Sequence, residues 1–98
     1  MNIYLLSQRK PDGSLKNDNY DVFDMCVVYA SSEEEARHTH PDSDEAYVWR
    51  DGKWFDEKGR PSSFADWVSP EDVTVTLVGT AINENPPSRV ICASFLAG

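Results

Sequence analysis

The sequence holds one clear helix signal, and the helix that it predicts is short. In SSEEEARHTHP, residues 31–41, Ser32 and Glu35 have the spacing of a capping box, whose two side chains satisfy free amides at a helix start. The glutamates that follow suit the positive end of the helix dipole. Pro41 ends the helix after about two turns. A helix of this length is not stable alone, so we expect it to pack on a sheet.

Most of the remaining chain has the pattern of β-strands. The most secure strand is VTVTLVG at 73–79, where residues alternate between two faces. NIYLLSQ at 2–8 and YDVFDMCVVYA at 20–30 predict two more strands, joined by a polar loop at 9–19. The last strand, RVICASFLAG at 89–98, is apolar on both faces, so we place it centrally in the sheet.

A two-residue β-hairpin is predicted for YVWRDGKWF, residues 47–55. Asp51-Gly52 is a favoured pair for a type I′ turn, in which both central residues have positive φ. This turn sets the pairing of the two short strands: Val48 with Phe55, Trp49 with Trp54, and Arg50 with Lys53. Further along the chain, SPED at 69–72 predicts a single helical turn with proline at its first position.

These elements predict one α+β domain covering residues 1–98. Its core is a mainly antiparallel sheet of about five to six strands, with one short helix on a face, in the order β-β-α-β-β-β-β. Leu, Ile, Val and Phe make up 21 of the 98 residues. That share lies just above the floor of about 20% below which a highly charged chain stays disordered.

The net charge of -8 excludes some classes of partner. An acidic chain does not suit direct binding of nucleic acid, which needs a basic face, nor adhesion to an anionic membrane. Residues 12–45 carry the whole excess, with ten acids and two bases, while the remainder is balanced. No apolar run approaches the roughly 20 residues of a membrane span. The run Ile3 to Leu6 is too short for a signal peptide, so we expect a cytoplasmic protein.

The two cysteines, Cys26 and Cys92, both lie within apolar runs. Free cysteine packs like a small hydrophobic residue, so we predict two buried strand thiols. A disulfide between adjacent strands is the alternative.

No motif of a known catalytic or cofactor site is present. The sequence has no glycine-rich phosphate loop, no His-Glu-x-x-His, no Cys-x-x-Cys and no Gly-x-Ser-x-Gly. His38 and His40 fall at the predicted helix end, where their directions do not converge on one metal ion. Asp21 and Asp24 face opposite sides of a strand. We therefore assign no catalytic residue, cofactor or metal.

The strongest candidate site is an aromatic and basic stretch around the hairpin. Trp49, Trp54 and Trp67 lie near several arginines and lysines, a combination typical of binding hot spots. The same groups suit stacking on a base and holding a phosphate. The alternative is that the hairpin folds its tryptophans onto the core. The candidate ligand-binding residues are Tyr20, Asp24, His40, Trp49, Arg50, Lys53, Trp54, Arg60 and Trp67.

The segments YLLSQ, YDVFDMCVV, SEEEARHTHP, WVSPEDVTVTLVGTA and VICASFLAG occur in this order. With them the chain resembles a family of small, uncharacterised proteins encoded by bacteria, prophages and phages. The resemblance covers nearly the whole length apart from the 9–19 loop and residues 42–63. This sequence departs from the family where Phe23 or Met25 replaces a small polar residue and where Leu96 replaces asparagine.

The resemblance implies a non-enzymatic phage or prophage accessory protein that antagonises host defence in the host cytoplasm. It would sequester a nucleotide-type signal or bind a host protein. A nucleotide site would be a concave pocket, favouring a homo-oligomer. One alternative is a housekeeping or structural adaptor with a protein partner only. Another is a small nucleotide hydrolase that uses the carboxylates of residues 20–24 with a histidine.

Overall fold

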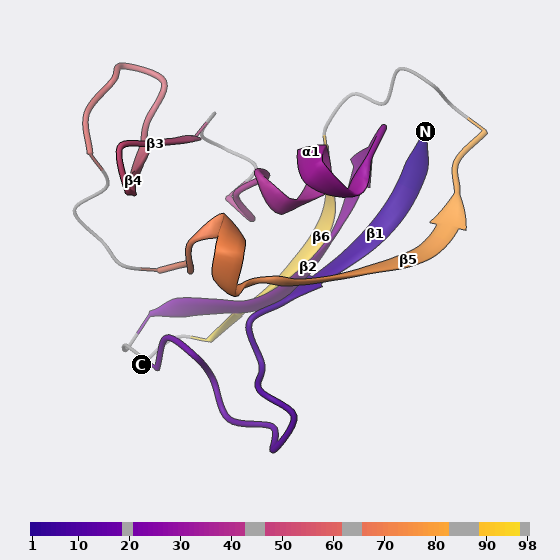
Figure 1. Ribbon diagram of the computed structural model, residues 1–98, viewed down its shortest axis with the longest axis horizontal. Helices are drawn as coiled ribbons and strands as arrows, with labels where there is room; N and C mark the ends of the chain where they lie inside the picture. Colours follow the sequence, from indigo (N-terminus) through magenta and orange to yellow (C-terminus); the bar gives the residue numbers. More distant parts are fainter. Residues whose placement is uncertain (19–20, 43–46, 62–65, 83–88, 97–98) are drawn as a thin grey trace.

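The computed structural model describes residues 1–18, 21–42, 47–61, 66–82 and 89–96. It has a four-stranded antiparallel sheet in the order β5-β1-β2-β6 and a separate two-stranded hairpin, β3-β4 (Figure 1). The α+β class and the predicted order of elements are confirmed. The elements are β1 (Asn2–Ser7), β2 (Val22–Ala30), α1 (Glu33–Arg37), β3 (Val48–Arg50), β4 (Lys53–Phe55), the 3₁₀ helix η1 (Pro70–Asp72), β5 (Thr74–Thr80) and β6 (Val90–Leu96).

The four-stranded sheet buries one face more completely than the other. The register of β1 on β2 pairs Tyr4 with Val28 and Leu6 with Cys26, and all four side chains are buried. The helix α1 contacts β1, β2 and β5 and covers this face. Buried and partly covered residues therefore alternate along the whole of β2. Residues that alternate with the buried set are only partly covered: Ile3, Leu5, Met25, Val27 and Tyr29.

The start of α1 follows the predicted cap in part. The Ser32 hydroxyl accepts a hydrogen bond from the Glu35 amide at 3.1 Å. The Glu35 carboxylate does not close the box on Ser32, because it accepts from the Ser31 hydroxyl at 2.7 Å. The helix also ends at Arg37, earlier than the sequence predicts. There the Thr39 hydroxyl donates to the Glu35 carbonyl while the Thr39 amide turns to Ala36, so the α-helical ladder stops.

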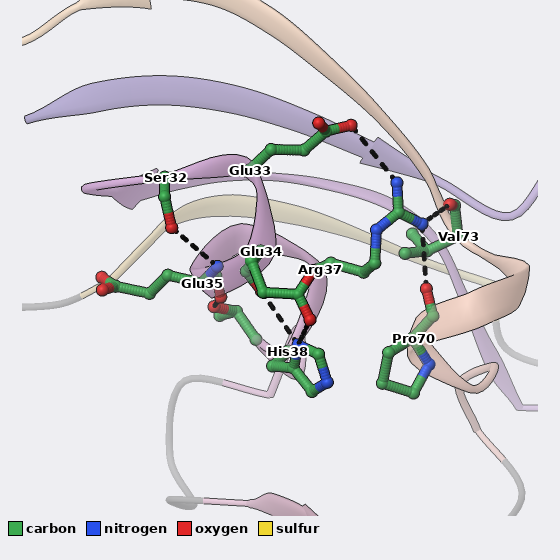
Figure 2. A network of polar contacts seen from close by, with 9 residues as sticks. Ser32, Glu33, Glu34, Glu35, Arg37, His38, Pro70 and Val73 are labelled. Carbon is green, nitrogen blue, oxygen red and sulfur yellow. Dashed lines mark hydrogen bonds and ion pairs between the residues drawn. The ribbon is translucent and has the colours of Figure 1, made fainter.

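Arg37 ties α1 to the segment that enters β5. Its Nη1 donates to the carbonyls of Pro70, at 3.0 Å, and Val73, at 2.8 Å, while its Nη2 reaches Glu33 at 3.3 Å (Figure 2). One guanidinium thus satisfies two main-chain acceptors beside η1. Glu33 and Arg37 are four residues apart, a spacing that predicts their ion pair but not the contacts with η1.

A buried glutamine at the end of β1 holds the 9–18 loop. Gln8 is fully buried, and its backbone amide donates to Asp24 O while its carbonyl accepts from Lys16 N. Its side-chain Nε2 donates to Phe23 O at 2.6 Å, and Oε1 accepts from Asn17 N at 2.7 Å. All these polar groups of Gln8 are therefore satisfied, and they join β1, β2 and the loop.

The predicted central position of the last strand is wrong. β6 pairs with β2 and is an outer strand of the sheet, and six of its seven residues are exposed. A run that is apolar on both faces does not distinguish a strand buried in the centre from an uncovered strand at the edge. The predicted strand at 20–30 begins at Val22. The segment NENPPS at 83–88, whose asparagines and prolines predict a turn, lies outside the described residues.

Cys92 is consequently exposed, which corrects the expectation of two buried thiols, whereas Cys26 is buried. Cys26 lies opposite Ala93, and Cys92 lies opposite Val27, so the two thiols point to opposite faces of the sheet. Both are free. Burial raises the pKa of Cys26 to about 12.

We expect Gln8→Met to destabilise the fold by about 3 kcal/mol, because it leaves the Phe23 carbonyl and the Asn17 amide without their side-chain partner. Urea unfolding followed by circular dichroism measures the loss. The control is Lys10→Met, which makes an equally apolar change at an exposed loop residue. Equal midpoints for the two variants would contradict the role of Gln8.

The difference between the thiols predicts their reactivity. At pH 8 a thiol reagent should modify one cysteine per native chain and two in denaturant, since the thiolate is the reacting form. Cys92→Ser should reduce the native count to zero. The folded pKa of Cys26 lies above the ordinary value of 9.0, so its burial stabilises the fold below that pH and loses this effect as pH rises toward 12. Rapid modification of Cys26 in the native protein would contradict the buried placement.

Candidate functional site

The β3-β4 hairpin lies beside the four-stranded sheet (Figure 1). Its register matches the prediction, and its turn residues Asp51 and Gly52 have φ of 50° and 77°. Positive φ at both positions fits the type I′ turn. Alternation along the two strands separates an inner pair, Trp49 and Trp54, from an outward set. We call that set the outer face of the hairpin: Val48, Arg50, Lys53 and Phe55.

The inner side of the hairpin joins the hydrophobic core. Trp54 is 6% exposed and donates its indole N–H to Val68 O at 2.9 Å. Trp49 is half-buried, and its ring meets that of Trp54 edge to face at 5.3 Å. Trp67 is also buried in the core cluster. These placements match the alternative in which the hairpin folds its tryptophans inward.

His40 lies between the end of the helix segment and the hairpin. Its side chain is buried, with ring centroids 4.3 Å from Tyr47 and 5.2 Å from Trp54. Nδ1 accepts from the Asp42 amide at 3.0 Å, and Nε2 lies 3.2 Å from Asp66 Oδ1. A main-chain amide only donates, so the proton of the neutral ring sits on Nε2 and is shared with Asp66. Both ring nitrogens are therefore engaged within the protein.

The outer face of the hairpin combines cations with apolar surface. The Arg50 guanidinium lies 4.3 Å above the centre of the Phe55 ring, a cation–π contact that holds the arginine in place. Lys53 lies opposite Arg50 and is exposed, and Val48 is 57% exposed. Cationic and apolar groups thus stand side by side on a short, defined element.

Arg60 takes part in the loop after β4. Its amide and its Nε reach the two oxygens of Asp56, at 2.9 and 3.1 Å. The Arg60 amide above all, with the Lys58 amide and the Arg60 guanidinium, lowers the pKa of Asp56 below its ordinary value. Arg60 is exposed, but its guanidinium forms an ion pair with the Asp56 carboxylate. This ion pair distinguishes Arg60 from Lys53.

Asp24 is buried and paired with a residue that the sequence analysis did not single out. Arg9 approaches it with two nitrogens, Nε at 2.7 Å from Oδ1 and Nη2 at 3.1 Å from Oδ2. Arg9 and Asp24 are 15 positions apart in the chain, so no spacing pattern in the sequence predicts this ion pair. Tyr20 lies outside the described residues.

The structure thus divides the candidate residues by placement. Asp24, His40, Trp54 and Trp67 are buried, Trp49 is half-buried, and Arg50, Lys53 and Arg60 are exposed. Within the described ranges, no three His, Cys, Asp or Glu side chains gather where they would hold a metal ion. Among those residues, too, no helix has the length and apolar character to cross a membrane.

Comparisons with protein-family models, curated proteins and solved structures gave no match to this chain.

The indole N–H of Trp54 should contribute to stability where that of Trp49 does not. We expect Trp54→Phe to lower stability by about 2 kcal/mol, because the Val68 carbonyl loses its buried donor and the core loses volume. Trp49→Phe is the matched control, since it makes the same change at the cross-strand partner. Thermal and urea unfolding measure both. Equal losses would contradict the inward anchoring of Trp54.

Proposed function

We propose that this protein is a non-enzymatic binding protein that docks the outer face of its hairpin on an acidic surface of a partner protein. The observation that carries this proposal is the pairing of Arg50 and Lys53 beside the apolar Val48 and Phe55. Arginine and aromatic groups dominate the energy of protein interfaces. The cation–π contact with Phe55 orders Arg50 before binding, which lowers the entropy lost on association.

A protein partner fits this surface better than a nucleotide-type ligand. Stacking a base needs an accessible ring face. Trp54 and Trp67 are in the core, and the Phe55 ring is covered by Arg50, which leaves the half-buried Trp49. Arg50 and Lys53 still suit a phosphate, so nucleotide sequestration is the second candidate.

The placement of the acid–base candidates supports binding over hydrolysis. Both nitrogens of His40 are engaged, and the carboxylate of Asp24 is held by Arg9. A general base needs a free lone pair within reach of the proton that it removes. Asp24 and His40, two of the residues that a nucleotide hydrolase would use, are therefore occupied by structural contacts.

The resemblance to phage and prophage proteins supports a setting for this binding. We propose an accessory factor that acts in the cytoplasm of the host by occupying a host defence protein in a stoichiometric complex. An adaptor that binds a protein of the cell in normal growth uses the same surface, and identification of the partner distinguishes the two.

The test is affinity capture from a lysate of the native host with the wild type and with Arg50→Gln/Lys53→Gln. Glutamine keeps much of each side chain's stem and removes the charge. We expect the double variant to lose about tenfold or more of the captured partner, a difference of roughly 1.4 kcal/mol. The single variant Lys53→Gln should fall between them, while Lys10→Gln, a matched change at another exposed lysine, should capture as the wild type does.

Equal capture by the double variant and the wild type would contradict the proposal. Thermal unfolding with ATP or inorganic pyrophosphate tests the second candidate. A stabilisation by either anion that disappears in Arg50→Gln/Lys53→Gln would assign the outer face to a nucleotide-type ligand in place of a protein.

A further inference from the structure

β6 is an outer strand with an unusual lack of protection. Its sequence from Val90 to Leu96, VICASFL, holds no charged residue and no proline. Ile91 is 43% exposed, Phe95 49% and Leu96 37%. Within the part of the chain that the structure describes, β6 has β2 on one side and no strand on the other.

An edge strand of this kind is a template for further pairing. From Ile91 to Leu96, half of the backbone N–H and C=O groups point away from β2, and no strand of the described residues pairs with them. Natural proteins block such edges with lysine, proline or bulges. The pairing of β6 with β2 is irregular at two places. One is near Ile91, where Val27 pairs with Cys92 and Val28 with Val90, and the other is on β2 at Asp24, where Phe23 pairs with Phe95 and Met25 with Ser94. The four residues from Ala93 to Leu96 carry none of the blocking side chains.

We propose that β6 pairs antiparallel with β6 of a second copy of this chain, which joins the two four-stranded sheets into one. A two-fold axis at Ala93 places Ile91 opposite Phe95, Cys92 opposite Ser94 and Val90 opposite Leu96. Large apolar residues then meet large apolar residues, and small residues meet small residues. The strand is complementary to itself in this register, as an isologous interface requires.

The other edge of the sheet, β5, does not offer this match. Self-pairing of β5 about its central Leu77 would set Val75 against Gly79 and Thr76 against Val78. Pairing of β5 with β6 would be a head-to-tail contact, which builds rings or open filaments and not a dimer. Only the symmetric β6 contact uses the apolar run fully and ends at two copies.

Area and charge set the strength of this dimer. Stable complexes bury about 800 Å² on each partner, more than a single seven-residue edge provides, so we expect a weak and reversible dimer. Each copy carries a net charge of -8, and the two copies repel. Because the contact strand itself is uncharged, added salt screens the repulsion and strengthens the dimer.

Sedimentation velocity across a concentration series tests the proposal. The wild type should pass from monomer to dimer, and the transition should move to lower concentration in high salt. Ile91→Lys would place an ammonium against Phe95 of the partner subunit and should weaken the dimer by about tenfold or more. Leu77→Lys is the matched control on β5, where the side chain is 59% exposed, and should dimerise as the wild type does.

Cross-linking reports the register and needs no disruptive variant. Ser94→Cys places a new thiol opposite Cys92 of the partner subunit, at the spacing of about 4.5–5.5 Å between paired Cα atoms that a disulfide accepts. Mild oxidation should give a covalent dimer. Thr76→Cys, on β5, should not.

Three results would overturn the proposal. In the first, the wild type stays monomeric at every concentration. In the second, Leu77→Lys disrupts the dimer, whereas Ile91→Lys is folded and still dimerises. In the third, Ser94→Cys and Thr76→Cys cross-link equally. Should circular dichroism show that Ile91→Lys is unfolded, the cross-linking comparison decides.

Discussion

The buried His40 ring, held by Asp66, is a main contact between the hairpin and the rest of the fold. β3 and β4 form their own two-stranded sheet, so their position relative to the main sheet depends on side chains. The His40 ring is held by Asp66 on one side and contacts Phe23 of β2 at 6.0 Å and Trp54 of β4 at 5.2 Å. One buried imidazole thus joins the sheet, the hairpin and the segment before η1. Without it the indole of Trp54 would lose a ring contact that connects the hairpin to β2.

This anchoring explains how an acidic protein presents a cationic surface. The inner side of the hairpin contributes Trp54 to the core, and the outer face is left to Arg50 and Lys53. The tryptophans therefore contribute to the site indirectly, because they pack the hairpin onto the core while the cations point away from it. Burial of aromatic groups supplies far more stabilisation than an exposed ion pair, so this packing does not depend on the charges that the hairpin carries.

The features that the sequence predicted are those fixed by neighbours in the chain. Asp51-Gly52 alone specifies the turn and hence the register of Trp49 on Trp54, and Ser32 specifies the start of α1. Contacts between distant segments left no such signal. Gln8 binds the backbone of Phe23 and of Asn17, and a lone glutamine after a strand does not reveal these partners. The position of β6 in the sheet also depends on contacts between distant segments. An apolar strand is central when strands pair with it on both sides, and outer when a strand pairs with it on one side only.

The hairpin and β6 belong to different sheets, and this matters for binding. Since β3 and β4 are not strands of the main sheet, pairing through β6 leaves the outer face unchanged on each copy. A dimer would then carry two identical outer faces in a fixed orientation. Two weak contacts on one rigid support bind a partner with two acidic sites far more tightly than either contact alone, because the second association becomes intramolecular. A reversible dimer of a small protein would in this way couple its binding strength to its own concentration.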